Sequence, residues 1–410
     1  MSWILKTCLA LITLVGVAYW NLPRWISIFA GASEWTVLQG ESLSPEAEAF
    51  LEPLLKGLRG HELIDVHMHL AGRGLGSDCW VNPRMLSRRY PGAWGRFQAY
   101  LSAGHLSEQD PDPLFAQGAI RLAAALPIPG QFHMLAFDYA CDGEGQPLPE
   151  FSAFHVPDAY AIETTGNAGP RFHPVVSIHP ARSDAIERLG EAAAAGGVLV
   201  KWLPSAQNID PDNPAWGPFY AEMKRLGMIL LVHCGREEAM ETGDWGHLAN
   251  PLRLRRPLGM GLRIIVAHCA TTGLGKDLDE PGAPDQPNFK LWLRLMDEPQ
   301  YEGLLFGDIS TLTQVNHFEH GLLELLERQD LHARLLNGSD WPLPGIHILY
   351  QLKPLVLKGL INAEDMGPLK ELYLFNPLLF DLALKRALHH PKTTARFSDS
   401  VFLTRPDLGL

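Results

Sequence analysis

The stretch that decides the fold is Leu63-Ile64-Asp65-Val66-His67-Met68-His69, an apolar β-strand with two imidazoles at its end. Successive side chains of a strand point to opposite faces, so His67 and His69 are expected on one face, about 6–7 Å apart. Asp65 is expected on that face one step deeper, holding a neighbouring N–H group rather than a metal. Two such histidines are half of a metal site, with a simple strand cap as the alternative.

The composition bounds the classes of protein that the chain can belong to. Its 410 residues are 46% hydrophobic and 20% charged, enough for one large domain or two ordinary ones. The formal net charge of -12 argues against nucleic acid as a partner, because no basic surplus exists to neutralise phosphates. The five cysteines form no Cys-x-x-Cys pair, which predicts neither a zinc ribbon nor a disulfide framework, although one disulfide stays open.

Residues 1–32 differ in kind from the rest. Residues 7–23 carry no charge and are mostly apolar, and a second apolar stretch covers residues 25–32. This length lies between the ~20 residues of a spanning helix and the ~7–15 residues of a signal-peptide core. We expect an N-terminal apolar helix that anchors the protein in a membrane. A cleaved signal followed by export, or a buried or peripheral helix, are the alternatives.

Seven more apolar runs follow the first strand, and helical patterns separate several of them. Most runs are rich in Val, Ile and Leu without clean alternation, as in parallel strands covered on both faces. This order predicts an α/β fold of the (β/α)₈ TIM-barrel type over residues 61–390, after a linker and leading helix at 33–60 and before a tail at 391–410. A doubly wound open sheet is the alternative, weakened because no glycine-rich phosphate loop follows any strand. The runs cover residues 132–139, 173–179, 198–203, 228–234, 263–269, 304–310 and 334–339, and the helical patterns cover 42–59, 183–195, 216–226, 289–295 and 318–329.

One connection is oversized. It separates His69 from Phe132 and contains several arginines and aromatic residues. Loops that follow barrel strands lie at the active-site end, and long ones are usually functional. We expect this segment to form part of a substrate pocket or its lid. An insertion that only covers the barrel or makes an oligomer contact is the alternative.

Polar residues stand where further strands end. In a barrel these ends meet at one mouth, and a buried charge or imidazole is costly there unless it is paired or bound to metal. With the two histidines of the first strand they predict a metal site. Imidazole and carboxylate donors suit Zn²⁺, with Mn²⁺ or Fe²⁺ as alternatives. The residues are Lys201, His233, His268 and Asp340.

This order of residues resembles the metal-dependent amidohydrolase superfamily over residues 62–381. The closest stretches, at 197–211, 231–235 and 335–344, resemble the amidohydrolase-related branch of metal-dependent hydrolases and non-oxidative decarboxylases. The resemblance implies that Asp340 also handles the proton of the attacking water. It implies that His268 binds a second metal or acts as an acid, base or oxyanion stabiliser. The implied metal ligands are His67, His69, His233 and Asp340.

Two residues keep alternative roles. Lys201 is implied to be either a carboxylated bridge between two ions or an amine beside one ion, and one ion is expected because this branch usually holds one. Arg236 is expected to bind a substrate carboxylate, with a salt bridge to a nearby glutamate as the alternative. The remaining candidates carry less weight: His179, His247 and Arg73 as pocket residues, Asp308 as a structural acid, and Cys234 and Cys269 as packing thiols.

These expectations combine into a function. The leading hypothesis is a hydrolase that uses a metal-bound water to cleave an amide, cyclic amide or lactone in a small molecule. A metal-dependent decarboxylase or hydratase of a small carboxylic acid is the alternative. A non-catalytic, membrane-anchored barrel with a structural metal is a third reading, against which the full ligand set counts. Homo-oligomerisation stays open.

Overall fold

The central element is a closed barrel of eight parallel strands, which confirms the predicted α/β barrel. The computed structural model describes residues 21–238, 240 and 242–410. Neighbouring strands follow the order β1-β3-β5-β6-β7-β8-β11-β12. The ring closes where the N–H of Val66 donates to the carbonyl of Asn337 at 3.0 Å. The strands are β1 (Leu63–His69), β3 (Gly130–Leu135), β5 (Phe172–Val176), β6 (Leu199–Trp202), β7 (Ile229–His233), β8 (Ile264–Ala267), β11 (Leu305–Asp308) and β12 (Leu335–Leu336).

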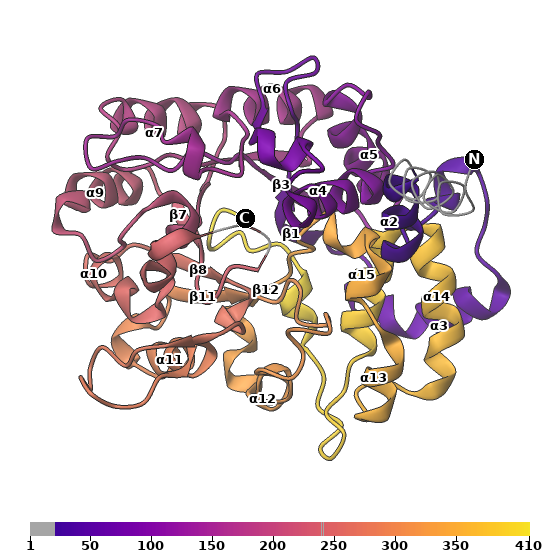
Figure 1. The fold of residues 1–410 in the computed structure, drawn as a ribbon. Coiled ribbons are helices and arrows are strands. Elements are labelled where there is room, and N and C mark those ends of the chain that lie inside the picture. The colour runs from indigo at the N-terminus through magenta and orange to yellow at the C-terminus, as the bar shows by residue number, and fades with distance from the viewer. Residues whose placement is uncertain (1–20, 239, 241) are drawn as a thin grey trace, which may run out of the picture.

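Helices surround this ring on the outside (Figure 1). The leading helix begins at Pro45, because the Ser44 side chain accepts the N–H of Ala47 at 3.2 Å and Pro45 occupies the first turn. The α-helices are α2 (Leu22–Ala30), α3 (Pro45–Leu55), α4 (Pro91–Ala103), α5 (Pro113–Ala124), α6 (Asp158–Ala168), α7 (Ala185–Ala194), α8 (Pro204–Gln207), α9 (Gly217–Arg225), α10 (Arg255–Gly259), α11 (Asn288–Met296), α12 (Leu322–Glu327), α13 (Leu352–Leu357), α14 (Met366–Phe375) and α15 (Pro377–Ala387). Two small antiparallel pairs join β2 (Trp80–Val81) to β4 (Phe154–His155) and β9 (Leu274–Gly275) to β10 (Gln286–Pro287).

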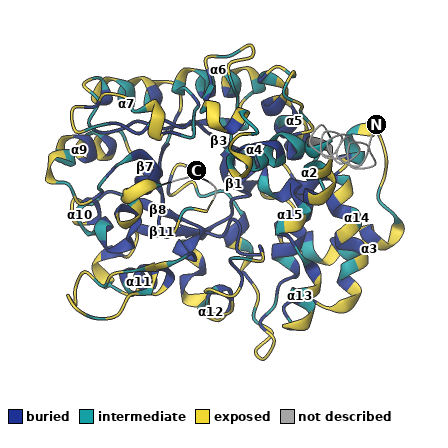
Figure 2. Ribbon diagram, in the orientation of Figure 1, coloured by how far each residue is buried: buried dark blue, intermediate teal, exposed yellow. Residues whose placement is uncertain are grey.

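Alternation along the strands divides the core into two layers. One apolar cluster fills the barrel and includes Ile64, Leu135, Val175, Leu199 and Ile229. The neighbouring strand residues point outward and pack under the helices, whose outer faces are exposed (Figure 2). Both faces of each strand are therefore buried, which explains the continuous apolar runs in the sequence.

The C-terminal segment closes the amino end of the barrel. Leu408 and Leu410 pack into the interior cluster, and Figure 1 shows the C-terminus in the middle of the ring of strands. The segment is fixed to strand beginnings, since the N–H of Thr404 donates to the Glu62 carbonyl at 3.0 Å and Arg263 donates to the Leu408 carbonyl at 3.3 Å. A cavity of the molecule lies at the other end, where the strands finish.

The prediction of a membrane anchor over residues 1–32 is wrong. In the described part of the chain, no helix has the length and apolarity that crossing a bilayer requires. The helix there, α2, has nine residues, or about 14 Å at 1.5 Å per residue, less than half of a ~30 Å hydrocarbon core. It packs on the protein instead, because Ser27 bonds to Ser102 of α4 at 2.7 Å and Ala30 is buried. Residues 1–20, on which the rest of this prediction and its signal-peptide alternative fell, lie outside the described residues.

Several predicted strands and helices extend further along the sequence than the observed elements do. β3, β5 and β12 end before the predicted runs do, and α12 is shorter than the pattern at 318–329. At the strand ends the chain leaves the sheet to place polar groups at the barrel mouth. Asp340 therefore lies on the segment after β12 rather than in the strand itself.

Candidate functional site

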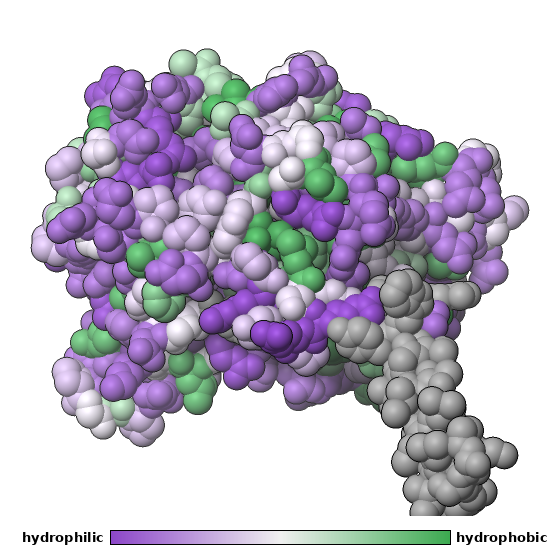
Figure 3. All heavy atoms as spheres, turned by 45° about the horizontal axis from the view of Figure 1, so that its top comes forward, coloured by the Kyte–Doolittle hydropathy of each residue, from purple (hydrophilic) through white to green (hydrophobic). Residues whose placement is uncertain are grey.

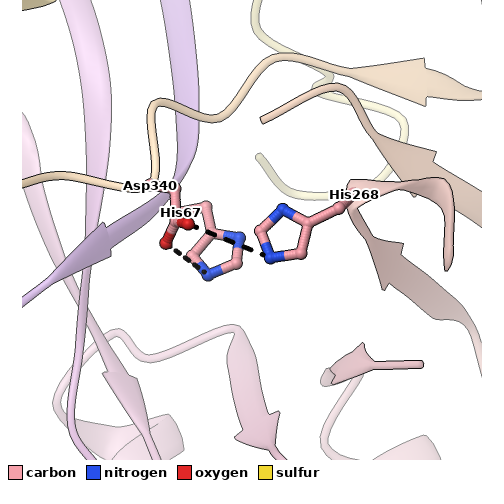
Figure 4. A group of neighbouring side chains, drawn as sticks. All are labelled: His67, His268 and Asp340. Atoms are coloured by element: carbon pink, nitrogen blue, oxygen red, sulfur yellow. Dashed lines mark ion pairs between the residues drawn. The ribbon is translucent and has the colours of Figure 1, made fainter. Parts of the chain in front are cut away.

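Three buried residues converge at the carboxyl end of the barrel (Figure 4). His67 comes from β1, His268 follows β8 and Asp340 follows β12. One ligand atom from each lies within 4.8 Å of the others. The Asp340 carboxylate approaches both rings, with Oδ1 at 3.4 Å from Nε2 of His67 and Oδ2 at 3.9 Å from Nε2 of His268. Strand ends that are far apart in sequence thus meet at one point.

The other two predicted histidines border this cluster. Nε2 of His69 lies 3.0 Å from Oδ1 of Asp340. The His233 ring lies 5.3 Å from the His268 ring, and its Nε2 is buried without a hydrogen-bond partner. The nearest carboxylate to that atom is Oε2 of Glu237, at 3.6 Å. The structure therefore brings all five predicted imidazole and carboxylate residues together.

Asp308, at the end of β11, orients the histidine at the centre of the cluster. Nδ1 of His67 donates to Oδ2 of Asp308 at 2.9 Å, so Nε2 is left facing Asp340 and Lys201. Burial alone would raise the pKa of Asp308, but the charges and hydrogen bonds of His67 and its neighbours hold that pKa well below its usual range. The sequence suggested only a structural acid here.

Ser310 orients the second imidazole. Its Oγ lies 2.8 Å from Nδ1 of His268, and the same hydroxyl donates to Asp308. With Nδ1 engaged, Nε2 of His268 is the atom that faces Asp340. Burial lowers the pKa of His268 well below its ordinary value, so the ring is neutral near pH 7. A neutral ring can accept a proton or bind a metal.

The backbone at two site residues is strained. Asp340 has φ of 55° and His268 has φ of 53°, in the left-handed region that non-glycine residues seldom adopt. The surrounding structure holds the first of these turns. The N–H of Asp340 donates to the His67 carbonyl at 2.7 Å, and the N–H of Ser339 donates to Asp65 at 2.9 Å. Asp65 thus binds backbone N–H groups, as expected from its position in the strand.

Lys201 of β6 is buried beside the cluster. Its Nζ lies 3.0 Å from Nε2 of His67. Burial lowers the pKa of Lys201 to about 8, although the negative charges of Asp308, Asp340 and Glu237 act in the opposite direction. These carboxylates supply the partners that a buried ammonium group needs, so an uncarboxylated lysine is compatible with the site.

The donor set fits a divalent metal. Burial raises the pKa of Asp340, but His67, His69 and His268 more than offset that effect and keep the pKa well below the usual range. The carboxylate is therefore anionic and available as a ligand. Imidazole nitrogens with one carboxylate are the donors that Zn²⁺ and Mn²⁺ take in proteins. Nε2 of His233 is buried and makes no hydrogen bond, so it is a further nitrogen that could bind a metal.

A cavity of about 530 Å³ opens onto this cluster. The long connection after β1 contributes α4 to its wall, as the sequence predicted for this segment. Two lining residues, Tyr100 of α4 and His317 after β11, were not identified from the sequence. A polar residue after a strand end was the available signal for His317. Tyr100 carried no local signal, because its place depends on how α4 folds back over the barrel.

Three predicted candidates do not join the cluster. Arg236 lines the cavity, but its Nη2 forms an ion pair with Glu238 at 2.6 Å and its side chain is 72% exposed. This pairing is the alternative that the sequence left open. His179 and His247 are not among the residues that line the cavity.

Cys234 and Cys269 follow two of the site histidines and are both buried. Burial raises the pKa of each thiol, which disfavours the reactive thiolate. Cys269 donates to the Asp308 carbonyl at 3.2 Å. Both cysteines are packing groups, as expected.

Comparisons with known proteins agree with this geometry at the level of the family. The family model described as Amidohydrolase matches residues 64–358. No curated protein matches the chain. Solved structures that resemble it include an uncharacterized TIM-barrel protein from Bordetella bronchiseptica, with 18% identity, coverage of 78% of this chain and 99% of that chain, and a TM-score of 0.47.

Two further structures carry functional descriptions. A putative 2-pyrone-4,6-dicarboxylic acid hydrolase from Pseudomonas putida has 15% identity, coverage of 80% and 95%, and a TM-score of 0.44. A 5-carboxyvanillate decarboxylase from Novosphingobium aromaticivorans, with bound manganese, has 12% identity, coverage of 78% and 96%, and a TM-score of 0.43. All three TM-scores lie below 0.5, so the assignment to a family rests on the family model.

Proposed function

Because the chain belongs to the amidohydrolase family, we propose that it is a metal-dependent hydrolase of a small molecule. The bond cleaved is the C–N bond of an amide or cyclic amide, or the C–O bond of a lactone. The observation that carries this proposal is the convergence of His67, His268 and Asp340 at the inner end of a cavity. A metal that served only as a structural staple would not require a cavity of ligand size beside it.

The proposed metal ligands are His67, His69, His233 and Asp340. Zn²⁺ is the proposed ion and Mn²⁺ the alternative, since both accept these donors. A bound divalent ion supplies a Lewis acid, which polarises the substrate carbonyl and lowers the pKa of water at the site.

Asp340 is the proposed general base. Its carboxylate is anionic because the surrounding histidines hold its pKa low, and it faces the space where the substrate carbonyl would lie. It accepts one proton from the attacking water as the new C–O bond forms. It then returns that proton to the leaving nitrogen or oxygen as the old bond breaks. The balance is one water consumed per bond cleaved, with no other reactant.

His268 and Lys201 are proposed to stabilise the oxyanion that forms on the carbonyl. Lys201 is proposed to act as an amine beside one metal ion. The support for this form is its contact with His67 and the nearby carboxylates, which make carboxylation unnecessary for charge balance.

Decarboxylation is the second candidate function, and one observation favours it. Arg73 and Arg96 line the cavity, and within the described residues neither guanidinium group has an ion-pair partner. Such groups could bind a substrate carboxylate. Hydrolysis ranks first because the anionic Asp340 carboxylate at the cluster can accept a proton from the attacking water.

The test is metal analysis of the purified full chain, followed by a panel of lactones, amides and aromatic acids with and without the bound metal. We expect metal-dependent hydrolysis of a lactone or an amide. Release of carbon dioxide from an aromatic acid, with no hydrolysis, would transfer the assignment to the second candidate. A metal-loaded protein that is inactive on the whole panel would contradict both enzymatic assignments.

Lys201→Ala separates the two models of the site. With an amine beside a single ion, we expect the metal content to stay the same while turnover falls. A loss of metal from two ions to one, with partial recovery of activity by short carboxylic acids, would instead support a carboxylated bridge.

A further inference from the structure

The cavity extends well beyond the polar cluster, and three segments outside the barrel strands build this outer part. They are α2, α4 and residues 342–349 after β12. A small apolar cluster joins them, in which Ala30 of α2 and Ala103 of α4 pack with Ile346. Hydrogen bonds fix the same arrangement, since Tyr373 donates to the Gly345 carbonyl at 2.9 Å and the N–H of Ser33 donates to it at 3.3 Å. The outer wall is therefore a built part of the fold.

This outer wall is apolar along most of its length. Aliphatic and aromatic side chains from all three segments line it, and more come from α5, from β4 and from the loops after β1 and β6. Hydrophobic residues also gather at the centre of the face drawn in Figure 3, among hydrophilic surroundings. Representative lining residues are Ile26, Phe29, Ala99, Phe115, Leu343 and Leu349.

The charged groups of the cavity do not form a basic pocket. Arg236 is already paired with Glu238. Arg73 and Arg96 have no ion-pair partner among the described residues, but the carboxylates of Asp110, Asp112 and Glu237 line the same cavity. The whole chain carries a formal charge of -12, so its long-range field does not draw anions inward. A wall with both signs of charge attracts a substrate with several carboxylates less than a basic pocket would, whereas a long apolar group gains from each methylene that leaves water.

We propose that the substrate is a neutral molecule with a long apolar group. Its cleavable carbonyl lies at the histidine–aspartate end of the cavity, and its alkyl or aryl group lies between α2, α4 and residues 342–349. A γ-lactone with a medium-length alkyl chain, or the amide of a medium-length acid, has this chemistry. This inference rests on the proposed hydrolytic function for the reaction, but its binding part stands on the cavity alone.

The first experiment measures kcat/KM of the metal-loaded enzyme on γ-lactones whose alkyl substituent grows from methyl to hexyl. We expect a rise of roughly fourfold per added methylene until the cavity is filled. A matched lactone with a carboxylate at the end of its chain should be a poorer substrate than the neutral one. A flat series, or a preference for the carboxylate form, would overturn the proposal.

Cavity variants locate the effect. Ala99 lines the cavity from α4, so Ala99→Leu should lower kcat/KM for the hexyl lactone at least tenfold more than for the methyl lactone. Ala194→Leu makes the same change at an exposed position of α7 and should leave the chain-length profile unaltered. Phe29→Ser removes an apolar lining group that is 76% exposed, so it keeps the fold and should flatten the profile. Equal losses of kcat/KM on both lactones would contradict the proposed position of the alkyl chain of the substrate.

A binding measurement separates this inference from the proposed function. The neutral fluorophore Prodan shifts its emission to shorter wavelength in apolar surroundings, so its binding requires no turnover. We expect it to bind the wild-type protein, to be displaced by the hexyl lactone and to bind more weakly to Ala99→Leu. Binding without hydrolysis would retain the apolar site and reject the hydrolase. Hydrolysis of short lactones without Prodan binding would retain the hydrolase and reject the apolar site.

Discussion

The two ends of the eight-stranded barrel differ in what they bury: polar groups at the carboxyl end and apolar side chains at the amino end. At the carboxyl end, buried imidazoles and carboxylates crowd together, and Asp340 and His268 adopt left-handed backbone conformations. At the amino end, Leu408 and Leu410 of the C-terminal segment seal an apolar interior. Buried polar groups and strained residues each lower the stability of the folded state, whereas buried leucines raise it. One end therefore carries the polar, strained groups of the proposed site, and the apolar packing at the other end helps to offset their cost.

The largest expected effect comes from a substitution at the carboxyl end alone, Asp340→Asn. In Asp340→Asn the side chain keeps its size and one oxygen for a metal, but it cannot accept a proton. We expect turnover to fall by ~10²–10⁴-fold while metal stays at least partly bound. The exposed control Asp285→Asn should have wild-type kinetics. Unchanged turnover of Asp340→Asn at neutral pH would remove the water-activation mechanism.

The next largest effect is a loss of stability from substitutions at the amino end alone. Leu408→Ala combined with Leu410→Ala removes two buried side chains from the barrel interior. We expect the free energy of unfolding to fall by roughly 2–5 kcal/mol, with kcat unchanged at temperatures where the variant is folded. Leu357→Ala, at a side chain that is 87% exposed, is the matched control and should change stability little. A variant as stable as the wild type would show that the C-terminal segment does not seal the barrel.

A smaller effect concerns pH. His133 of β3 is buried, both of its ring nitrogens lack hydrogen-bond partners, and burial lowers its pKa to about 3. Because the unfolded chain, with a histidine pKa near 6.5, binds this proton more readily, stability falls as the pH drops from 6.5 towards 3. At pH 5 the loss is roughly 2 kcal/mol for this group.

Denaturant unfolding of His133→Leu between pH 7 and 5 tests this assignment. We expect the variant to lose less stability on acidification than the wild type, by about the amount given above. The other buried histidines still titrate in both proteins, so the difference between the two curves is the informative quantity. His61→Leu, at an exposed position, should follow the wild-type curve. Parallel curves for wild type and His133→Leu would exclude His133 as a source of acid sensitivity.

The sequence was sufficient for those features that follow from local rules. Apolar runs that end in a polar residue predicted both the barrel and the meeting of His67, His233, His268 and Asp340, because strand ends converge in this fold. The residues that orient the site histidines were harder to predict. Asp308 acquires its role by accepting a hydrogen bond from a residue on another strand, which no spacing encodes.

Contacts between distant segments explain the remaining differences. The apolar stretch at residues 25–32 predicts part of a membrane anchor, because apolarity alone does not indicate what covers a segment. In the structure α2 packs on α4 through Ser27 and Ala30 and lines the cavity, while Phe29 stays largely exposed. Tyr100 enters the site only because α4 folds over the barrel mouth.

The central claim is that the carboxyl end of the barrel holds a divalent metal. Its most direct test is the metal content of the purified full chain after loading with Zn²⁺ or Mn²⁺ and removal of free ions, compared between wild type, His67→Ala and the exposed control His61→Ala. We predict that wild type and His61→Ala retain one ion per chain and that His67→Ala, folded by circular dichroism, retains almost none. A wild-type protein without bound metal, or a His67→Ala variant with the wild-type content, would contradict the account.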